Sequence, residues 1–409
     1  MKKIILIHPG FTHPFKSGKI FTSIFKHVDS LVQALKDEFT VVLIKTTDSD
    51  KVYGDEVKYL EIDFTSNLVL PAEKKISNSY KLKRAAATKR AIKDQYGASL
   101  DLIISENCLT NFSYIDEKIP KLVFFHHTYD NPFWGGLSFM NLSMYFKMND
   151  HLKKGSNFAF VSKFQRLSYI RGLSSKLKPR ILKPNFEKLG FDKVKALADI
   201  EELDLSKCPV LLNPLELQNK ELSTNKKDYV VYVGRCHPEK RIEKIIKLAG
   251  QVGKLIKVYC STTDELKEYE DKIQALASPT VEIYFNHPYS DIMESVKNST
   301  CLLLASNESL SYVAAEAFYY NVPVFHFNKD AIAGNDSPIF EMAPIGYYAY
   351  IDKKDNVSVE FNDFINGFNE DLSEIEKFRD RMSIKTFRTN LISTINSMIA
   401  KTPKKLFEY

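Results

Sequence analysis

The sequence has 409 residues, which is ordinary for two domains and long for a single hydrophobic core. Its 44% hydrophobic and 26% charged residues are typical of a soluble globular protein, and no apolar run approaches the ~20 residues that a membrane-spanning helix needs. The first residues, MKKIILIHPGF, predict a β-strand with a basic flank and not a signal peptide. Five widely spaced cysteines without a C-x-x-C motif argue against a disulfide framework and a zinc site, so we expect a cytoplasmic protein.

The net charge of +6 is unevenly distributed along the chain. Residues 1–200 hold 32 Lys and Arg against 20 Asp and Glu, whereas residues 201–409 hold 25 against 31. A stretch rich in charged residues is most often a solvated surface. An excess of basic residues of this size also suits a polyanionic partner for the first half of the chain. The candidates for a polyanion surface lie in residues 162–183, which contain no acidic residue: Lys163, Arg166, Arg171, Lys176, Lys178 and Arg180.

Strand-like apolar runs alternate with segments of helical period, which predicts an α/β architecture with parallel sheets. The predicted strands of the first half are 3–8, 40–45, 102–105, 122–126 and 158–161, with helices at 20–35 and 80–95. A second series has strands at 229–234, 256–260, 281–285, 301–305 and 323–327, with a helix at 241–252.

The two series are separated by residues 182–228, which are interrupted by Pro184, Pro209 and Pro214. We place a domain boundary there. A helical pattern over 371–401 follows the last predicted strand, and in two-domain folds of this kind such a tail often crosses back onto the first domain. The predicted division is therefore a first domain at 1–205, a second domain at 206–385, and a C-terminal helix at 386–409 that returns to the first domain.

The segment LLASNESLSYVAAEAFYYNVPVF reads as a strand, a polar turn, a helix that begins near Ser309 or Leu310, and a short strand. Glu308 would lie at the helix N-terminus and Glu316 about two turns further, so both can line one edge of a cleft. Unpaired amides of Ser309, Leu310 and Ser311 could bind a diphosphate or sugar hydroxyls, and a carboxylate inside the helix suits a ribose diol. The alternative is a capping Glu308 and an exposed helical Glu316.

The segment YVVYVGRCHPEKRIEK predicts a strand ending at Gly234, a turn that presents Arg235, and Lys240 and Arg241 where the next helix opens. Basic residues at a helix N-terminus oppose the macrodipole by roughly 0.3–1 kcal/mol each, so their placement is easier to understand if an anion shares the site. Arg235 and Lys240 would neutralise a diphosphate leaving group. The alternative is ordinary surface charge with helical ion pairs.

These two segments resemble the retaining GT-B glycosyltransferases over about residues 205–330. That family has a Gly-Arg…Glu-Lys segment and two glutamates separated by seven residues, which are matched here by Gly234, Arg235, Glu239, Lys240, Glu308 and Glu316. The resemblance implies two Rossmann-like domains with parallel sheets that face a central cleft, an acceptor domain followed by a nucleotide-sugar donor domain. It also implies a retaining transferase that needs no metal and no cofactor, with a UDP-sugar as the expected donor.

Carried over to this sequence, the resemblance implies Arg235 and Lys240 on the donor diphosphate and Glu316 on the ribose. Glu308 and the amides of residues 309–311 would face the transferred sugar. The sequence departs from the family pattern twice. The usual Gly-Phe-Gly after the first glutamate is Ser309-Leu310-Ser311, which leaves the sugar open, and the usual glycine before Pro-Val is Asn321.

In the first domain the family has a Gly-rich loop after the first strand, and Gly18 is the best match for its second glycine. The segment FHHTYD follows a predicted strand, and one of its histidines matches a sugar-contacting position; His127 is favoured over His126. A core histidine bonded to the backbone is the alternative. The segment FVSKFQR resembles the end of the family's first domain, where Lys163 could approach the donor or the acceptor.

The acceptor is predicted from charge and size. The basic first half would suit phosphate contacts with DNA, in which a target base must be flipped out of the duplex. Size and layout are similar to those of bacteriophage glycosyltransferases that modify hydroxymethylcytosine, which would place the protein in the host cytoplasm. The alternatives are an envelope glycan or glycolipid acceptor with peripheral membrane contact through residues 163–183, a sugar-nucleotide 2-epimerase, and a non-catalytic DNA-binding protein. The sequence does not specify the oligomeric state.

Overall fold

The computed structural model describes a defined part of the 409-residue chain, in which no helix is long and apolar enough to cross a membrane. The described residues are 2–8, 23–46, 53–62, 78–106, 119–125, 157–163, 166, 208–215, 217, 221–223, 226–262, 266–306, 311–327, 338–351 and 356–401.

The chain forms two compact units. The first contains Met1–Pro214 and Ile384–Tyr409, and the second contains Leu215–Ser383. The boundary between them thus lies nine residues beyond the expected 205/206, in the proline-interrupted segment. Because residues 384–409 belong to the first unit, the chain passes from one unit to the other twice.

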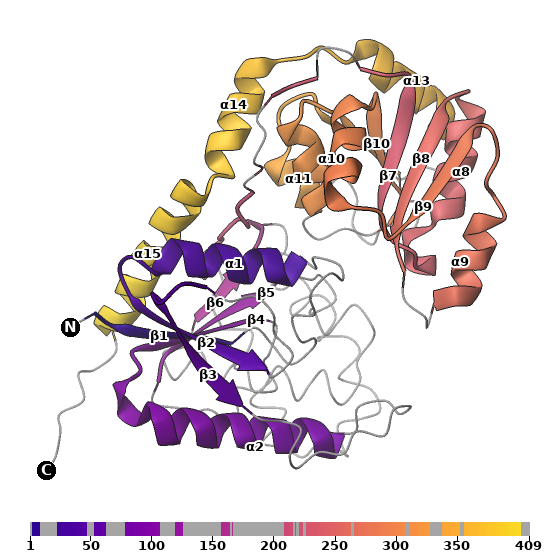
Figure 1. The fold of residues 1–409 in the computed structure, drawn as a ribbon. Coiled ribbons are helices and arrows are strands. Elements are labelled where there is room, and N and C mark those ends of the chain that lie inside the picture. Colours follow the sequence, from indigo (N-terminus) through magenta and orange to yellow (C-terminus); the bar gives the residue numbers. More distant parts are fainter. Residues whose placement is uncertain are drawn as a thin grey trace, which may run out of the picture. The chain divides into compact units, whose positions relative to one another are not determined.

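The first unit contains a parallel sheet of six strands with the order β3-β2-β1-β4-β5-β6. The strands are β1 (Ile4–His8), β2 (Thr40–Thr46), β3 (Val57–Ile62), β4 (Leu102–Glu106), β5 (Lys121–Phe125) and β6 (Asn157–Phe160). The helices are α1 (Ser23–Leu35), α2 (Asn78–Gln95), the short 3-10 helix η1 (Gly97–Ser99) and α15 (Ile384–Lys401). Figure 1 shows α1 and α15 on one face of this sheet and α2 on the other.

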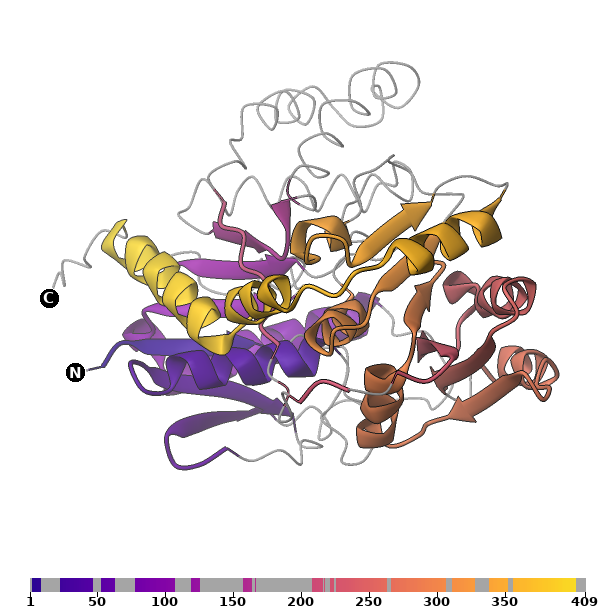
Figure 2. The ribbon, with the colours of Figure 1, turned by 90° about the horizontal axis from the view of Figure 1, so that it is seen from above.

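Helix α15 completes the core on the α1 face. Helix α1 buries Val28, Leu31, Val32 and Leu35, an i, i+3, i+4, i+7 stripe that faces the sheet. Helix α15 packs beside α1 (Figure 2) and adds four buried side chains to the same cluster. They are Phe387, Leu391, Ile395 and Met398. Burial of such side chains stabilises by about 1.5–3 kcal/mol each, so α15 is an integral part of the first unit.

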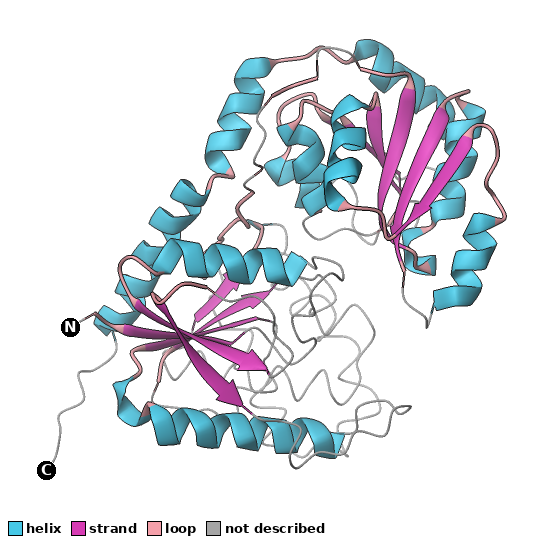
Figure 3. Ribbon diagram, viewed as in Figure 1, coloured by secondary structure: helices cyan, strands magenta, loops and turns pink. Residues whose placement is uncertain are grey.

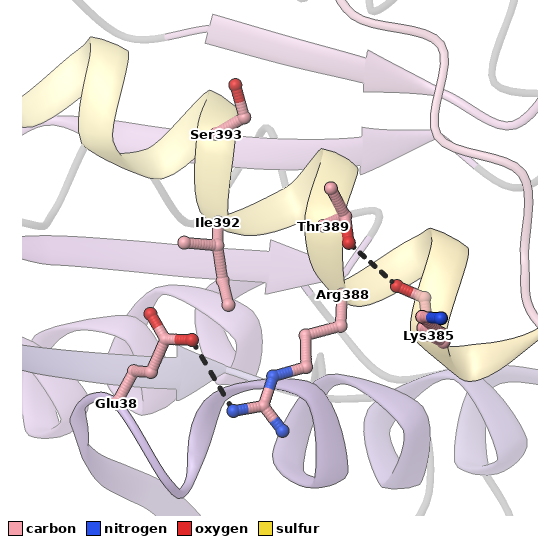
Figure 4. Close-up of a pocket in the computed structure, with 6 residues that line it drawn as sticks. All are labelled: Glu38, Lys385, Arg388, Thr389, Ile392 and Ser393. Carbon is pink, nitrogen blue, oxygen red and sulfur yellow. Dashed lines mark hydrogen bonds and ion pairs between the residues drawn. The ribbon is translucent and has the colours of Figure 1, made fainter.

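Charged contacts also fix α15 to the turn after α1. Arg388 donates from Nη1 to Asp37 Oδ2 at 2.8 Å, and its Nη2 lies 3.4 Å from Glu38 Oε1. Figure 4 shows Arg388 and Glu38 facing each other across a shallow hollow on the surface. The hollow is lined by Glu38, Lys385, Arg388, Thr389, Ile392 and Ser393. It lies on the α1–α15 side of the sheet and holds none of the predicted site residues.

The second unit repeats the topology of the first. Its parallel sheet has the order β12-β11-β10-β7-β8-β9. The strands are β7 (Tyr229–Arg235), β8 (Leu255–Ser261), β9 (Val281–Phe285), β10 (Cys301–Leu304), β11 (Val324–Phe327) and β12 (Tyr348–Ile351). The helices are η4 (Pro238–Lys240), α8 (Ile242–Gln251), α9 (Lys267–Gln274), α10 (Tyr289–Asn298), α11 (Tyr312–Tyr319), α12 (Pro338–Met342), α13 (Val357–Gly367) and α14 (Leu372–Arg381).

Helices cover both faces of the second sheet, as Figures 1 and 3 show: α8, α9 and α13 on one face, α10 and α11 on the other. On the first face α8 buries Ile242, Ile245, Leu248 and Ala249 against β7 and β8. Strands buried on both faces read as continuous apolar runs, which explains why the sequence located most of them. The prediction of two parallel α/β sheets is confirmed. Strands β3 and β12, which had not been predicted, lie at the outer ends of the two sheets.

Asn321 stands where the family pattern has a glycine, and its backbone conformation explains why an asparagine fits there. It follows α11 with φ of 61°, in the left-handed region that glycine adopts most easily and that asparagine tolerates better than most residues. Its buried side chain also accepts a hydrogen bond from the Tyr347 hydroxyl at 2.5 Å, and the same hydroxyl accepts from the Asp371 amide at 2.8 Å. Asn321 therefore supplies the backbone conformation of the expected glycine and joins α11 to the start of α14.

We expect Asn321→Ala to lower the free energy of unfolding by about 2–3 kcal/mol, because it loses both the hydrogen bond and the conformational tolerance. Asn321→Gly loses only the hydrogen bond and should cost about 1 kcal/mol. Urea unfolding followed by circular dichroism measures both. Equal stability of the glycine and alanine variants would contradict this account of the backbone.

Candidate functional site

The strand order of the second sheet reverses between β7 and β10. From β7 the chain proceeds through β8 to β9 on one side, then returns so that β10 pairs with β7 on the other side. In open parallel sheets, the helices after two such strands leave toward opposite faces, and ligands bind beyond the carboxyl ends of the strands at this point. The residues that follow β7 and β10 are therefore the first candidates for a binding site.

Lys240 and Ser306 meet at this edge. Lys240 ends the short helix η4 after β7, and Ser306 follows β10. The Lys240 Nζ donates to Ser306 Oγ at 3.3 Å. Ser306 is 4% exposed and Lys240 is half-buried, so an ammonium group is held at the point where the strand order reverses. Arg241, which caps α8, has φ of 54°, a left-handed conformation that is uncommon for a side chain of this size.

Arg235 is the last residue of β7, and its side chain is exposed. Among the described residues its guanidinium has no hydrogen bond or ion pair, so its donors are available to a ligand. The preceding Gly234 has a local role, since a Cβ there would collide with the Tyr232 hydroxyl, which donates to the Arg235 carbonyl at 3.4 Å. Roles of Gly234 and Arg235 in binding a donor stay predictions.

Glu316 is buried and held by a tyrosine that the sequence did not single out. Helix α11 begins at Tyr312, with Ser311 as the N-cap whose Oγ accepts from the Ala314 amide at 3.3 Å. The helix therefore begins at Tyr312 and not near Ser309 or Leu310 as predicted, because the Ser311 side chain caps it. Glu316 lies just over one turn into α11, rather than two, and is 3% exposed.

The hydroxyl of Tyr289, at the start of α10, donates to Glu316 Oε1 at 2.5 Å. Burial of that hydroxyl and the neighbouring carboxylate raise its pKa, so it stays protonated and acts as a donor. One Glu316 oxygen is thereby oriented by a side chain from the neighbouring helix. The expectation of an exposed helical glutamate does not describe this position.

A buried histidine–glutamate pair in the first unit was also missed. His27 of α1 and Glu106 at the end of β4 are fully buried, with Nδ1 2.8 Å from Oε1. Because a carboxylate accepts, Nδ1 carries the hydrogen. The His27 ring packs edge-on against Phe124 of β5 and Phe387 of α15. The pair joins α1, β4 and α15 where β1 and β4 mark the reversal of the first sheet.

Two of the predicted polyanion residues are described. Lys163 follows β6 and is exposed. Arg166 is half-buried, and its Nη1 donates to the Cys208 carbonyl at 2.8 Å. This bond helps to hold residues 208–211, which pair with Phe160 through two backbone hydrogen bonds. Arg166 thus has a structural partner, and its role toward a polyanion stays a prediction.

Several predicted site residues lie outside the described residues: Gly18, His126, His127, Arg171, Lys176, Lys178, Arg180, Glu308, Ser309 and Leu310. The structure brings together Lys240 with Ser306 and Glu316 with Tyr289. Within the described ranges, no group of three or more His, Cys, Asp or Glu side chains is arranged to hold a metal ion.

Lys226 ties together the far ends of the two helices that carry Tyr289 and Glu316. Its Nζ donates to the carbonyls of Lys297 in α10 at 2.8 Å and Tyr320 after α11 at 3.2 Å. Burial lowers the Lys226 pKa to about 8, and a neighbouring Glu370 offsets part of the effect. A neutral amine keeps two donors, enough for both carbonyls.

The lowered pKa of Lys226 predicts that the free energy of unfolding increases with pH in the alkaline range. Between pH 8 and the ordinary range of a lysine, the unfolded chain binds more protons at Lys226 than the folded chain does, so the free energy of unfolding gains a contribution that increases with pH. The contribution is fully present above the pKa that Lys226 has in the unfolded chain. It is lost as the pH falls through the pKa that Lys226 has in the folded protein. Lys226→Met should remove this increase in chemical denaturation between pH 7.5 and 10, and Lys247→Met, on an exposed α8 position, should keep it. A Lys226→Met profile that parallels the parent would contradict the assignment.

The chain is similar to known proteins in part of its sequence and in its fold. Residues 215–334 match the family model described as glycosyl transferases group 1. No protein of curated function matches the chain in sequence. The structure is similar to AviGT4, a glycosyltransferase involved in avilamycin A biosynthesis, at 14% identity over 98% of both chains with a TM-score of 0.59.

Two further solved structures share the fold. Anabaena HepE in complex with UDP has 12% identity and a TM-score of 0.62, covering 97% of this chain and 100% of that one. The sucrose-phosphate synthase of Thermosynechococcus elongatus has 12% identity and a TM-score of 0.67, covering 98% and 100%. The two units with parallel six-stranded sheets have the GT-B fold of these solved structures. Within that fold, the segment that matches the group 1 glycosyltransferase model lies entirely in the second unit.

Proposed function

We propose that this protein is a retaining glycosyltransferase that moves a sugar from a nucleotide diphosphate, most simply UDP, to a hydroxyl acceptor. The observation that carries the proposal is the Lys240–Ser306 contact at the edge where β7 and β10 reverse the strand order. Arg235 ends β7 beside it with an exposed guanidinium. Two cations at the carboxyl edge of a parallel sheet suit a diphosphate. The UDP bound by the Anabaena relative supports uracil as the base.

The proposed roles follow from charge. Arg235 and Lys240 stabilise the diphosphate as the bond between it and the sugar C1 breaks. The buried Glu316 carboxylate, oriented by Tyr289, accepts hydrogen bonds from the ribose hydroxyls. In front-face displacement the acceptor oxygen bonds to C1 on the side that the diphosphate leaves, and its proton passes to a leaving phosphate oxygen. The chain's residues position the groups and stabilise charge, so the step requires no divalent metal.

Removal of the Lys240 ammonium tests the donor site. We expect Lys240→Met to weaken UDP binding by about ten- to a hundredfold, because a charge-assisted hydrogen bond contributes about 1.5–3 kcal/mol. Lys244→Met, at an exposed position on α8, is the matched control and should bind UDP as the parent does. Isothermal titration calorimetry with UDP measures both. Equal UDP affinity in Lys240→Met would refute the assignment of this edge to the diphosphate.

For the acceptor we propose hydroxymethylcytosine in duplex DNA. The first half of the chain is basic, and α2 contains six Lys and Arg against one Asp. Its described C-terminal part exposes Lys89, Arg90 and Lys93, while Thr88 and Ile92 are buried. Among the described residues, all exposed large apolar side chains belong to the second unit. The described basic face of α2 suits phosphates better than insertion into a lipid surface.

Charge reversal on α2 tests the DNA proposal. We expect the triple change Lys89→Glu, Arg90→Glu and Lys93→Glu to reduce transfer to hydroxymethylcytosine DNA and to flatten the salt dependence of DNA binding by about one unit of slope for each phosphate that the variant no longer binds. UDP affinity should remain. The double change Lys244→Glu and Lys247→Glu, on exposed α8 positions, is the matched control. Transfer that ignores modified DNA but is robust on a lipid-linked or free glycan would exclude DNA as the acceptor, and conversion of the donor without any acceptor would indicate an epimerase.

A further inference from the structure

A buried histidine in the second unit links β11 to the start of β12 and to the segment that follows β10. His326 of β11 is 2% exposed. Its Nδ1 lies 2.7 Å from the hydroxyl of Tyr348, the first residue of β12, and its Nε2 lies 2.6 Å from the carbonyl oxygen of Ser306, which follows β10. His326 pairs with Leu304 in the ladder, so its ring extends along the strand direction to reach the residue two positions further.

The partners of the ring define its tautomer. A carbonyl oxygen can only accept, so Nε2 carries the hydrogen in the contact with Ser306. In a neutral imidazole Nδ1 is then an acceptor, and the Tyr348 hydroxyl donates to it. The Tyr350 ring packs edge-on against the imidazole, with centroids 5.0 Å apart. Both nitrogens are engaged and the ring is enclosed, so its orientation is fixed.

Ser306 is consequently held from two sides. His326 donates to its backbone carbonyl, and Lys240 donates to its hydroxyl at 3.3 Å. These contacts form a continuous hydrogen-bonded chain from the start of β12 through β11 and the residue after β10 to the helix after β7. Its members are Tyr348, His326, Ser306 and Lys240. Each bond fixes the next group, so the position of the Lys240 ammonium depends on the carbonyl that His326 holds.

We propose that His326 is a positioning residue for donor binding, which acts through Ser306 to hold the Lys240 ammonium where it meets the diphosphate. The inference rests on the proposed function, because it takes Lys240 as a diphosphate ligand. His326 itself touches neither donor nor acceptor. Tyr348 supports it through the hydrogen bond to Nδ1, which keeps the ring directed at Ser306.

A histidine that only joined three strands would have a different signature. Its loss would lower stability and leave the ligand affinity of the folded protein unchanged. Tyr347 offers a matched control, since its hydroxyl also makes a buried bond in the second unit, to Asn321, but has no part in the chain to Lys240. Tyr347→Phe should therefore reduce stability without changing nucleotide binding.

The experiment is UDP titration by calorimetry on the full chain, well below the unfolding midpoint of each variant. We expect His326→Phe to weaken UDP binding about tenfold, because it removes a buried hydrogen bond and releases Ser306. His326→Gln, whose amide can donate to the Ser306 carbonyl, should recover most of the affinity. Tyr348→Phe should weaken binding by about threefold, and Tyr347→Phe should match the parent.

Unchanged UDP affinity in His326→Phe would overturn the inference, as would a loss in Tyr347→Phe equal to that in His326→Phe. If His326→Phe does not fold, Tyr348→Phe decides in the same way, because the histidine ring is intact there. The failure of the proposed function is recognisable separately. A parent protein that does not bind UDP would refute both the proposed function and this inference. UDP binding that depends on Lys240 but not on His326 would refute only this inference.

Discussion

The reversal of strand order between β7 and β10 is the constraint from which the candidate donor site follows. Parallel strands require crossover helices, and helices after neighbouring strands on either side of a reversal leave toward opposite faces. Residues separated by tens of positions, such as Lys240 and Ser306, therefore meet at one edge. The same reversal occurs between β1 and β4 in the first unit, where a buried histidine–glutamate pair lies. A shared topology thus places polar groups at equivalent edges of both sheets.

The sequence predicted the parallel α/β architecture because interior strands of such sheets are apolar on both faces. It missed β3 and β12, and their positions explain why. Both are outermost strands; β3 contains Lys58 and Glu61 among its apolar residues, and three of the four residues of β12 are only half-buried. Such strands have a weaker apolar signal than strands buried on both faces.

Within the candidate site, sequence reasoning proposed charged residues and missed the side chains that contact two of them. Lys240, Arg235 and Glu316 were selected by type and spacing, and their roles stay predictions, whereas Tyr289, Ser306 and His326 make contacts between segments distant in the chain. Periodicity reports which face a residue occupies, but not which side chain from another helix or strand reaches it. Asn321 is the intermediate case: the departure from glycine was visible, and its physical reason, a left-handed backbone with a bond to Tyr347, needed the structure.

The return of α15 to the first unit has a consequence for synthesis of the chain. The first core includes side chains of α1 and side chains of residues 384–401, which are made more than 300 residues later. The whole second unit is therefore synthesised before the first can close its core, which reverses the usual order in which the N-terminal domain folds first. Until α15 arrives, the α1 face of the first sheet lacks part of its cover, a period in which a chaperone could bind to it.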